Sequence, residues 1–136
     1  MGNVFAEITV KNAGDAMLAR NGHIAENDVR TLDLTAIVDT GASTLVINED
    51  IFNKLGLYVV ETRKINLAGG AKMEGKVTSP VSIKWKNRFA TVDAVVLPGG
   101  KPLLGLLPLE FMDLMVDPVR QELVGAHGDE AVLMAM

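Results

Sequence analysis

The feature that most constrains the fold of this chain is a succession of short segments in which apolar and polar residues alternate. In the first segment Val4, Ala6, Ile8 and Val10 recur with a period of two, as in a strand with one buried face. Turn-forming Gly, Pro and Asn residues separate the segments. The expected strands cover residues 3–11, 29–38, 58–62, 64–68, 72–77, 81–86, 88–97 and 121–124. So many short strands predict an all-β protein, either a barrel or a sandwich.

Helices are expected to be few and short. Asn48 can cap a helix over residues 49–55, and a glycine follows that segment. A second helix is expected to begin near Pro108, which suits a first helical position, and to reach Leu114. Residues 12–28 are mostly polar and are expected to form an excursion between two strands.

The length and composition indicate one folded domain. The chain has 136 residues, of which 49% are hydrophobic and 22% are charged, so it can build one core but not two. Trp85 alternates with Val81 and Ile83 on one strand and is expected in that core. We expect the domain to span residues 1–125, followed by a tail, 126–136, that is either a dimer-interface strand or disordered.

The composition also excludes several kinds of chemistry. The chain has no cysteine, which rules out disulfides, thiolate metal sites and a cysteine nucleophile. Its two histidines, His23 and His127, are far apart in the sequence and are expected at the surface, so we expect neither a metal nor another cofactor.

Charge and hydropathy bear on the partners. The net charge is −4 and the basic residues are scattered, so neither nucleic acid nor a membrane is an expected partner. The most apolar stretch, 103–116, is interrupted by Gly, Pro, Glu and Asp, and falls short of the roughly 20 apolar residues that cross a bilayer. The start lacks the basic and apolar regions of a signal peptide. The expectation is a soluble, cytoplasmic protein.

One aspartate has an unusual sequence context. Asp39 follows the apolar run Ala36-Ile37-Val38 and begins Asp39-Thr40-Gly41-Ala42-Ser43, after which the chain becomes apolar again. The tripeptide Asp-Thr-Gly alone also fits an ordinary hairpin turn. The apolar frame on both sides makes Asp39 a candidate for chemistry.

This segment resembles the active-site loop of the retroviral-type, or retropepsin-like, single-lobe aspartic proteases, and bacterial-type homologues are the nearer comparison. A second family element, an apolar-apolar-Gly block followed by a helix, is present in the right order as Leu103-Leu104-Gly105 and the segment from Pro108. Between them, the Gly-tipped segment 65–77 stands where the family carries its flap. The resemblance covers about residues 29–125. It implies a closed, single-lobe β-barrel with one or two short helices.

The resemblance implies a role for each site residue. Asp39 would be catalytic, Thr40 would interlock with its copy in a second chain, and Gly41 would bring its N–H near the carboxylates. Ser43 would donate a hydrogen bond to the outer carboxylate oxygen, while Ala42 and Gly105 would support the loop. The expected flap and substrate-binding residues are Leu67, Ala68, Gly69, Gly70 and Met73. Leu106 departs from the family pattern, because a polar residue is expected after the glycine.

Peptide hydrolysis explains why one motif is not enough. Two adjacent carboxyl groups share one proton, so that one activates water while the other polarises the carbonyl. The chain has a single such motif, which predicts an aspartic endopeptidase active as a homodimer on peptide or protein substrates. Residues 3–11 and 130–136 are candidates for its interface strands. Two alternatives stay open: a non-catalytic peptide-binding or dimerisation module with the same fold, and a small-ligand β-barrel with Asp39 in a turn.

Overall fold

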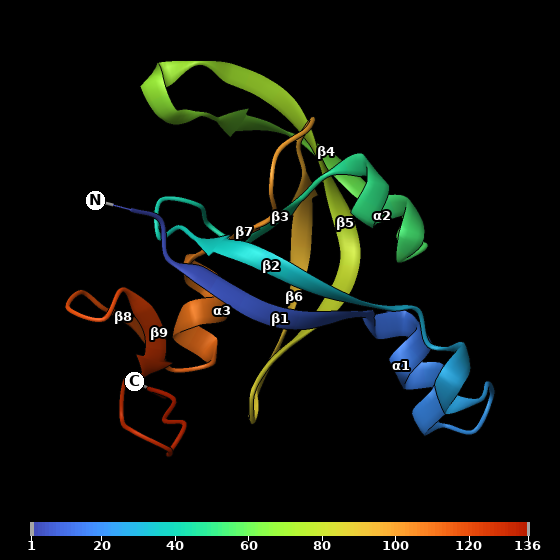
Figure 1. The fold of residues 1–136 in the computed structure, drawn as a ribbon. Coiled ribbons are helices and arrows are strands. Elements are labelled where there is room, and N and C mark those ends of the chain that lie inside the picture. Colours follow the sequence, from blue (N-terminus) through green and yellow to red (C-terminus); the bar gives the residue numbers. More distant parts are fainter. Residues whose placement is uncertain (1, 136) are drawn as a thin grey trace.

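The strands form one closed ring with a long hairpin attached. In the computed structural model, which describes residues 2–135, seven strands are ordered β1-β2-β7-β3-β6-β5-β4. An additional pairing of β1 with β5 closes the ring and leaves β4 outside it (Figure 1). The strands are β1 Phe5–Asn12, β2 Thr31–Val38, β3 Leu45–Ile47, β4 Val59–Asn66, β5 Lys72–Trp85, β6 Arg88–Val96 and β7 Leu103–Leu104. The expected all-β, acid-protease-like fold is confirmed.

Two parallel pairings position the segment that carries Asp39. Most neighbouring strands are antiparallel, but β2 pairs with β7 and β3 pairs with β6 in parallel. Because Val38 lies beside Leu104, the chain leaves β2 and β7 at the same place. The segment that begins at Asp39 therefore lies next to Gly105, although 65 residues lie between Asp39 and Gly105 in the sequence.

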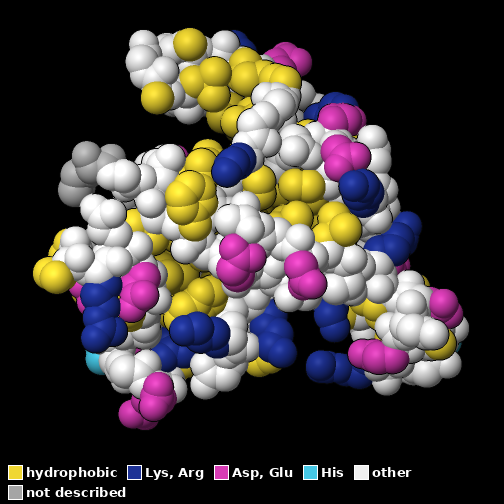
Figure 2. Space-filling model, viewed as in Figure 1, with side chains coloured by type: hydrophobic (Ala, Val, Ile, Leu, Met, Phe, Trp, Pro, Cys, Tyr) yellow, Lys and Arg dark blue, Asp and Glu magenta, His cyan; other side chains and the backbone are white. Residues whose placement is uncertain are grey.

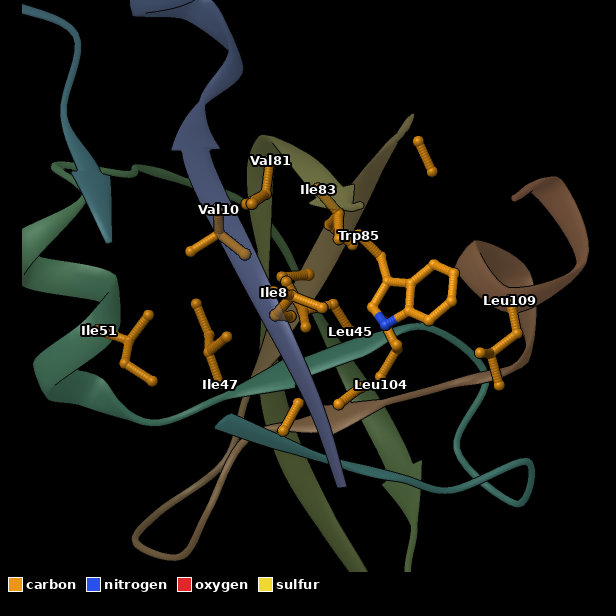
Figure 3. Close-up of a cluster of buried hydrophobic side chains, with 14 of the residues drawn as sticks. Ile8, Val10, Leu45, Ile47, Ile51, Val81, Ile83, Trp85, Leu104 and Leu109 are labelled. Carbon is orange, nitrogen blue, oxygen red and sulfur yellow. The ribbon is translucent and has the colours of Figure 1, made fainter. Parts of the chain in front are cut away.

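The interior of the ring is filled by aliphatic side chains and one tryptophan. Val10, Leu45, Val81 and Leu104 are fully buried, and Trp85 lies between the ring and the helix that follows β7 (Figure 3). The alternation of β1 continues through the ring, since its even-numbered residues are buried and its odd-numbered ones point outward. The expected core position of Trp85 is confirmed.

The part of the chain that the structure describes contains three α-helices: α1 Ala13–Arg20, α2 Glu49–Lys54 and α3 Leu106–Phe111. The position expected for α2 is confirmed, including its cap, because the Asn48 side chain accepts a hydrogen bond from Ile51 N at 2.9 Å. The expected start and end of α3 were wrong. Gly105 occupies its N-cap position, Pro108 is its third residue, and Leu114 begins the next strand.

Helix α1 was not expected, because it lies in the polar segment 12–28. Its start is capped by Asn12, whose side-chain oxygen accepts from Asp15 N at 3.0 Å. Asp15 also accepts from Arg30 Nε and from a terminal guanidinium nitrogen of Arg30, at 2.7 and 2.9 Å. This two-point ion pair ties the helix to the chain that enters β2.

Two pairs of expected strands are continuous in the structure. The expected strands 58–62 and 64–68 merge into the single strand β4, which ends two residues earlier at Asn66, and 72–77 and 81–86 merge into β5, which ends at Trp85. The Ser79-Pro80 pair does not end β5; it coincides with a shift of register against β6 between Val77 and Pro80. A proline is tolerated at such an irregularity because the strand needs no donor there.

The remaining elements form a small second sheet at the end of the chain. Strands β8 Leu114–Asp117 and β9 Glu122–Gly125 pair with each other. The segment after β9 contains no strand over 126–135; it folds back onto Asp113, whose carboxylate accepts from Val132 N at 3.0 Å and contacts His127 Nδ1 at 2.7 Å. The boundary at residue 125 stays a prediction. Within residues 2–135, no helix has the length and apolar character needed to span a membrane.

Candidate active site

The segment after β2 is a tight turn held by its own backbone and by β7. Asp39 N donates to Leu104 O at 3.0 Å, and Ala42 N donates back to Asp39 O at 3.1 Å. Gly41 N donates to Asp39 Oδ1 at 2.9 Å, so a backbone N–H is directed at the carboxylate. Asp39 is half-buried, whereas Thr40 and Gly41 are exposed. We call residues 39–44 the active-site loop.

Helix α3 supports the active-site loop from below. Leu106 N donates to Ala42 O at 2.8 Å, and Leu107 N donates to Ser43 O at 2.9 Å, so the first turn of the helix satisfies two carbonyls of the loop. Gly105 is buried between them, and a Cβ atom there would clash with the carbonyl oxygens of Thr44 and Ala42. The glycine is therefore required by this close approach and not by its own dihedral angles.

The hairpin of β4 and β5 extends over the active-site loop. Its tip, residues 67–71, closes with a hydrogen bond from Leu67 N to Ala71 O at 2.7 Å. Gly69 and Gly70 both have positive φ, 85° and 87°, which explains why two glycines occur in succession. The hairpin rises away from the ring at the top of Figure 1.

A groove of about 1310 Å³ lies between the hairpin and the loop. The hollow below the hairpin is visible in Figure 2. Its apolar lining comes from the ring, from the hairpin and from α3, and includes Val46, Ile65, Leu67, Val77, Val92, Val95, Leu97, Leu103, Leu107 and Phe111. Its polar lining includes Glu61, Arg63, Lys64, Asn66, Thr91 and Asp93. The groove is open to solvent, as binding of an extended peptide would require.

The structure brings together most of the residues that the sequence singles out. Those that line the groove are Asp39, Gly41, Ala42, Ser43, Leu67 and Ala68. Thr40, Gly69, Gly70, Met73 and Gly105 do not line it. Met73 pairs with Ile65 across the hairpin, but of the two only Ile65 lines the groove. Within residues 2–135, Ser43 Oγ makes no hydrogen bond to Asp39, so its expected role stays a prediction.

Several groove residues were missed by the sequence analysis. Arg63, Lys64 and Ile65 come from the outer strand of the hairpin, and Asp93 comes from β6. Alternation could show that these residues lie on strands but not which face meets the groove, because that depends on how the hairpin folds over the ring. Leu107 was missed because α3 was expected to begin later.

The charges in the groove are partly neutralised within the chain. Arg63 Nε is 2.8 Å from Glu61 Oε1, whereas Lys64 has no such ion pair within residues 2–135. Thr44 Oγ1 donates to the backbone carbonyl of Asp93 at 2.8 Å, which joins the end of the loop to β6. Within the same residues, no three His, Asp or Glu side chains are grouped to hold a metal ion. The chemistry available in the groove is that of a carboxylate beside a backbone donor.

Comparison with known proteins agrees with this geometry. Residues 22–111 match the protein family described as "Aspartyl protease". Among solved structures, EIAV protease complexed with the inhibitor HBY-793 has a similar fold, with a TM-score of 0.50 and 24% sequence identity over 76% of this chain and 82% of that one. No curated protein sequence matches. Because the family match covers more than half of the chain, the protein belongs to the aspartyl protease family and is an aspartic peptidase with a single-lobe, retropepsin-like fold.

Proposed function

We propose that the chain is an endopeptidase that works as a homodimer, with the two copies of Asp39 adjacent at the two-fold axis. The observation that carries this proposal is the placement of a single Asp-Thr-Gly loop at the edge of a peptide-sized groove. One carboxylate cannot both activate water and polarise the carbonyl. Thr40 and Gly41 are exposed at this edge and are available to a second copy.

The proposed mechanism uses one proton shared by the two Asp39 carboxyl groups. The ionised group removes a proton from water, and the protonated group donates a hydrogen bond to the peptide carbonyl. The water oxygen attacks the carbonyl carbon while the protonated carboxyl passes its proton to the carbonyl oxygen, which gives a tetrahedral intermediate. When the C–N bond breaks, the carboxyl that took the water proton gives it to the leaving nitrogen, and the other carboxylate takes back its proton from a hydroxyl of the intermediate, so the shared-proton pair is restored. The hydrogen bond from Gly41 N to Asp39 Oδ1 would fix the orientation of each carboxylate. Because the active form carries one shared proton, the rate should fall as that proton is lost with rising pH.

The surface beside the active-site loop suits a second copy. The side chains of Leu106 and Leu107 are 42% and 58% exposed. Both residues lie directly beside the loop, because their backbone amides donate to the carbonyl groups of Ala42 and Ser43. Placing two copies of Asp39 together would bring these leucines to the interface and remove their apolar surface from water. An apolar residue at position 106, where the family pattern has a polar one, fits this arrangement.

The substrate is proposed to be an extended peptide segment. The groove has an apolar floor and is bordered by the hairpin, whose backbone can pair with an added strand. The hairpin would act as a lid, since its tip is exposed and is joined by two glycines. Leu67 and Ala68 would contact the substrate from above.

Cleavage of a diverse peptide mixture by the wild type and by Asp39→Asn tests the catalytic role. The variant should lose about 10²- to 10⁴-fold in kcat/KM, because one amide per chain removes the shared proton chemistry. Asp93→Asn is the matched control, since this second groove aspartate undergoes the same change and lacks the Thr-Gly sequel. Discrete cuts, detected by mass spectrometry, should survive in the control. A dimeric wild-type sample that makes no cuts would support the non-catalytic binding module instead.

Sedimentation at micromolar concentration tests the dimer. Leu107→Asp should weaken self-association at least about tenfold, because it places a charge in an apolar interface. Met17→Asp is the control, because Met17 is 66% exposed on α1, away from the active-site loop. A wild-type protein that cleaves peptides while remaining monomeric would contradict the proposed arrangement.

A further inference from the structure

A second, smaller pocket lies on the outer face of the ring, away from Asp39. It has a volume of about 340 Å³ and is bounded by β1, β5, the start of β6, helix α1 and the turn after it. Helix α1 and strand β1 precede the part of the chain that matches the aspartyl protease family, which begins at residue 22. The pocket is thus built in part by a segment that the family match does not cover.

The floor of this pocket is formed by two paired strands that point alternating side chains outward. Thr9 lies opposite Lys84, and Lys11 lies opposite Ser82, in the pairing of β1 with β5. All four residues line the pocket. Two ammonium groups and two hydroxyl groups are therefore brought together on one small area of sheet. We call this site, with Arg20, the basic pocket.

Helix α1 adds a third positive charge at the wall. Arg20, in the last turn of the helix, lines the pocket together with Ala16. Lys11 and Thr9 are half-buried although they point out of the ring, because the helix and the neighbouring strand shelter them. Dark-blue side chains surround the hollow between α1 and the body of the molecule in Figure 2.

The three cations are not neutralised by the chain. Within residues 2–135, neither Lys11 nor Arg20 nor Lys84 forms an ion pair, whereas Arg30, near the same helix, is bound by Asp15. Glu26 is the only acidic residue among those lining the pocket. The lining therefore carries a net charge of +2 in a protein whose total is −4. Such a local concentration of positive charge attracts a doubly charged anion.

The hydroxyl groups and one aromatic ring narrow the chemistry of the ligand. Thr9 Oγ1 donates to Asp33 Oδ1 at 2.8 Å, outside the pocket, which leaves Ser82 as the available hydroxyl donor. Phe89 is 63% exposed at one end, and Lys84 Nζ lies 5.7 Å from its ring centre. A ligand could place an anionic group among the cations and an apolar part against this ring.

We propose that the basic pocket binds a small organic phosphate, with the phosphate held by Lys11, Arg20, Lys84 and Ser82 and the organic part against Phe89. A phosphate monoester carries nearly two negative charges at neutral pH and several strong acceptor oxygens, which matches the net charge and the donors of the site. A nucleic-acid backbone fits less well, because the chain as a whole carries a net charge of −4. The proposal does not depend on the peptidase reaction.

Titration of the full chain with phenyl phosphate, followed by calorimetry and by NMR of the backbone amides, tests the proposal at pH 7.5. We expect saturable binding, with the largest shifts at the residues of the basic pocket, and weaker binding of inorganic phosphate, which cannot contact Phe89. Benzoate, with an aromatic ring and a single charge, should also bind more weakly. Equal binding of benzoate and phenyl phosphate would overturn the preference for a dianion.

Charge variants complete the test. Arg20→Gln and Lys84→Gln should each weaken phenyl phosphate binding at least about tenfold, as expected for loss of one charge-assisted contact. Lys101→Gln removes the same charge from an exposed lysine outside the pocket and should leave binding unchanged. Asp39→Asn should bind phenyl phosphate as the wild type does, which separates this site from the peptidase centre. Shifts that rise without saturation, or an equal loss in the Lys101 control, would overturn the proposal.

Discussion

The active-site loop and the tip of the hairpin face each other across the groove, but they are held in different ways. The loop is bound to three other elements: to β7 through Leu104 O, to α3 through the amides of Leu106 and Leu107, and to β6 through the hydrogen bond from Thr44 to the Asp93 carbonyl. Among the residues that the structure describes, the tip is closed only by hydrogen bonds among its own residues, and no atom lies within 4 Å of a Cβ added at either of its two glycines. One wall of the groove is therefore held by contacts with the ring and α3, whereas the other wall is a hairpin whose tip is held by its own hydrogen bonds.

The difference teaches where this fold places its rigidity. A carboxylate that must meet a second carboxylate tolerates little displacement, so its segment is held by buried backbone contacts. A segment that must admit and release a peptide gains from few outside contacts, since local opening then costs little free energy. Substitutions at one glycine on each side of the groove test this contrast directly.

Gly105→Ala should break the rigid side. The added methyl group would clash with two loop carbonyls, and the backbone must move to admit it. We expect the free energy of unfolding to fall by about 3 kcal/mol, together with most of the activity. Urea denaturation monitored by the fluorescence of Trp85 measures the stability. An unchanged stability would mean that α3 and the loop are not held as the hydrogen bonds indicate.

Asp15→Asn should reduce the stability of the chain by weakening the ion pair that holds helix α1. Asp15 is buried and holds Arg30 at two points, so losing its charge should destabilise the chain by about 1–2 kcal/mol. Asp50→Asn is the matched control, because Asp50 pairs with Lys54 on an exposed surface. Thermal unfolding of the two variants at pH 7 gives the comparison. Equal destabilisation by both would contradict the structural role of Asp15.

The same ion pair makes the support of α1 sensitive to acid. The hydrogen bonds from the Arg30 side chain hold the pKa of Asp15 below its usual value of 3.8. A carboxyl group whose pKa is lowered on folding stabilises the protein above its unfolded pKa, and this stability is lost as the pH falls through the lowered value. Wild type should therefore lose stability relative to Asp15→Asn below about pH 4. Denaturation of the two proteins from pH 3 to pH 7 measures this difference.

Gly70→Ala should produce the smallest effect on stability and a selective effect on activity. Alanine disfavours a φ of 87°, but the tip is open and can relax, so we expect a loss under about 1 kcal/mol. If the hairpin closes on substrate, kcat/KM should still fall several-fold because the closed conformation becomes less accessible. Peptide cleavage beside urea denaturation separates the two. An activity loss that merely follows the stability loss would contradict the lid.

Much of the ring and the centre of the site were predictable from the sequence. The alternation in β1 and β2, the cap at Asn48 and the apolar frame of Asp39 all reflect local preferences that agree with the final structure. The supporting role that the resemblance implies for Gly105 stays a prediction, and the clash that a Cβ atom would make there supplies a physical reason for it.

The rest depended on contacts between distant segments. Helix α1 carries a weak apolar pattern and is stabilised by its cap and by Arg30, which is ten residues beyond its end, as the numbering shows. Pro80 looked like the end of a strand, but the pairing of β5 with β6 continues around it. The basic pocket could not be foreseen, because Lys11, Arg20 and Lys84 meet only after β1 and β5 close the ring.

Strand β5 determines the direction in which the β4–β5 hairpin extends over the groove. Its 14 residues run from the hairpin at Lys72 into the core at Trp85, so the wall of the ring and half of the hairpin are one continuous piece of backbone. The core therefore holds one end of this strand, and the hairpin leaves the ring at the irregularity between Val77 and Pro80, where Thr78 Oγ1 accepts from Ala94 N. A substitution that loosens the packing of the core would change the orientation of the hairpin before it unfolded the ring. The orientation of the hairpin is therefore set by the packing of the interior and not by the hairpin itself.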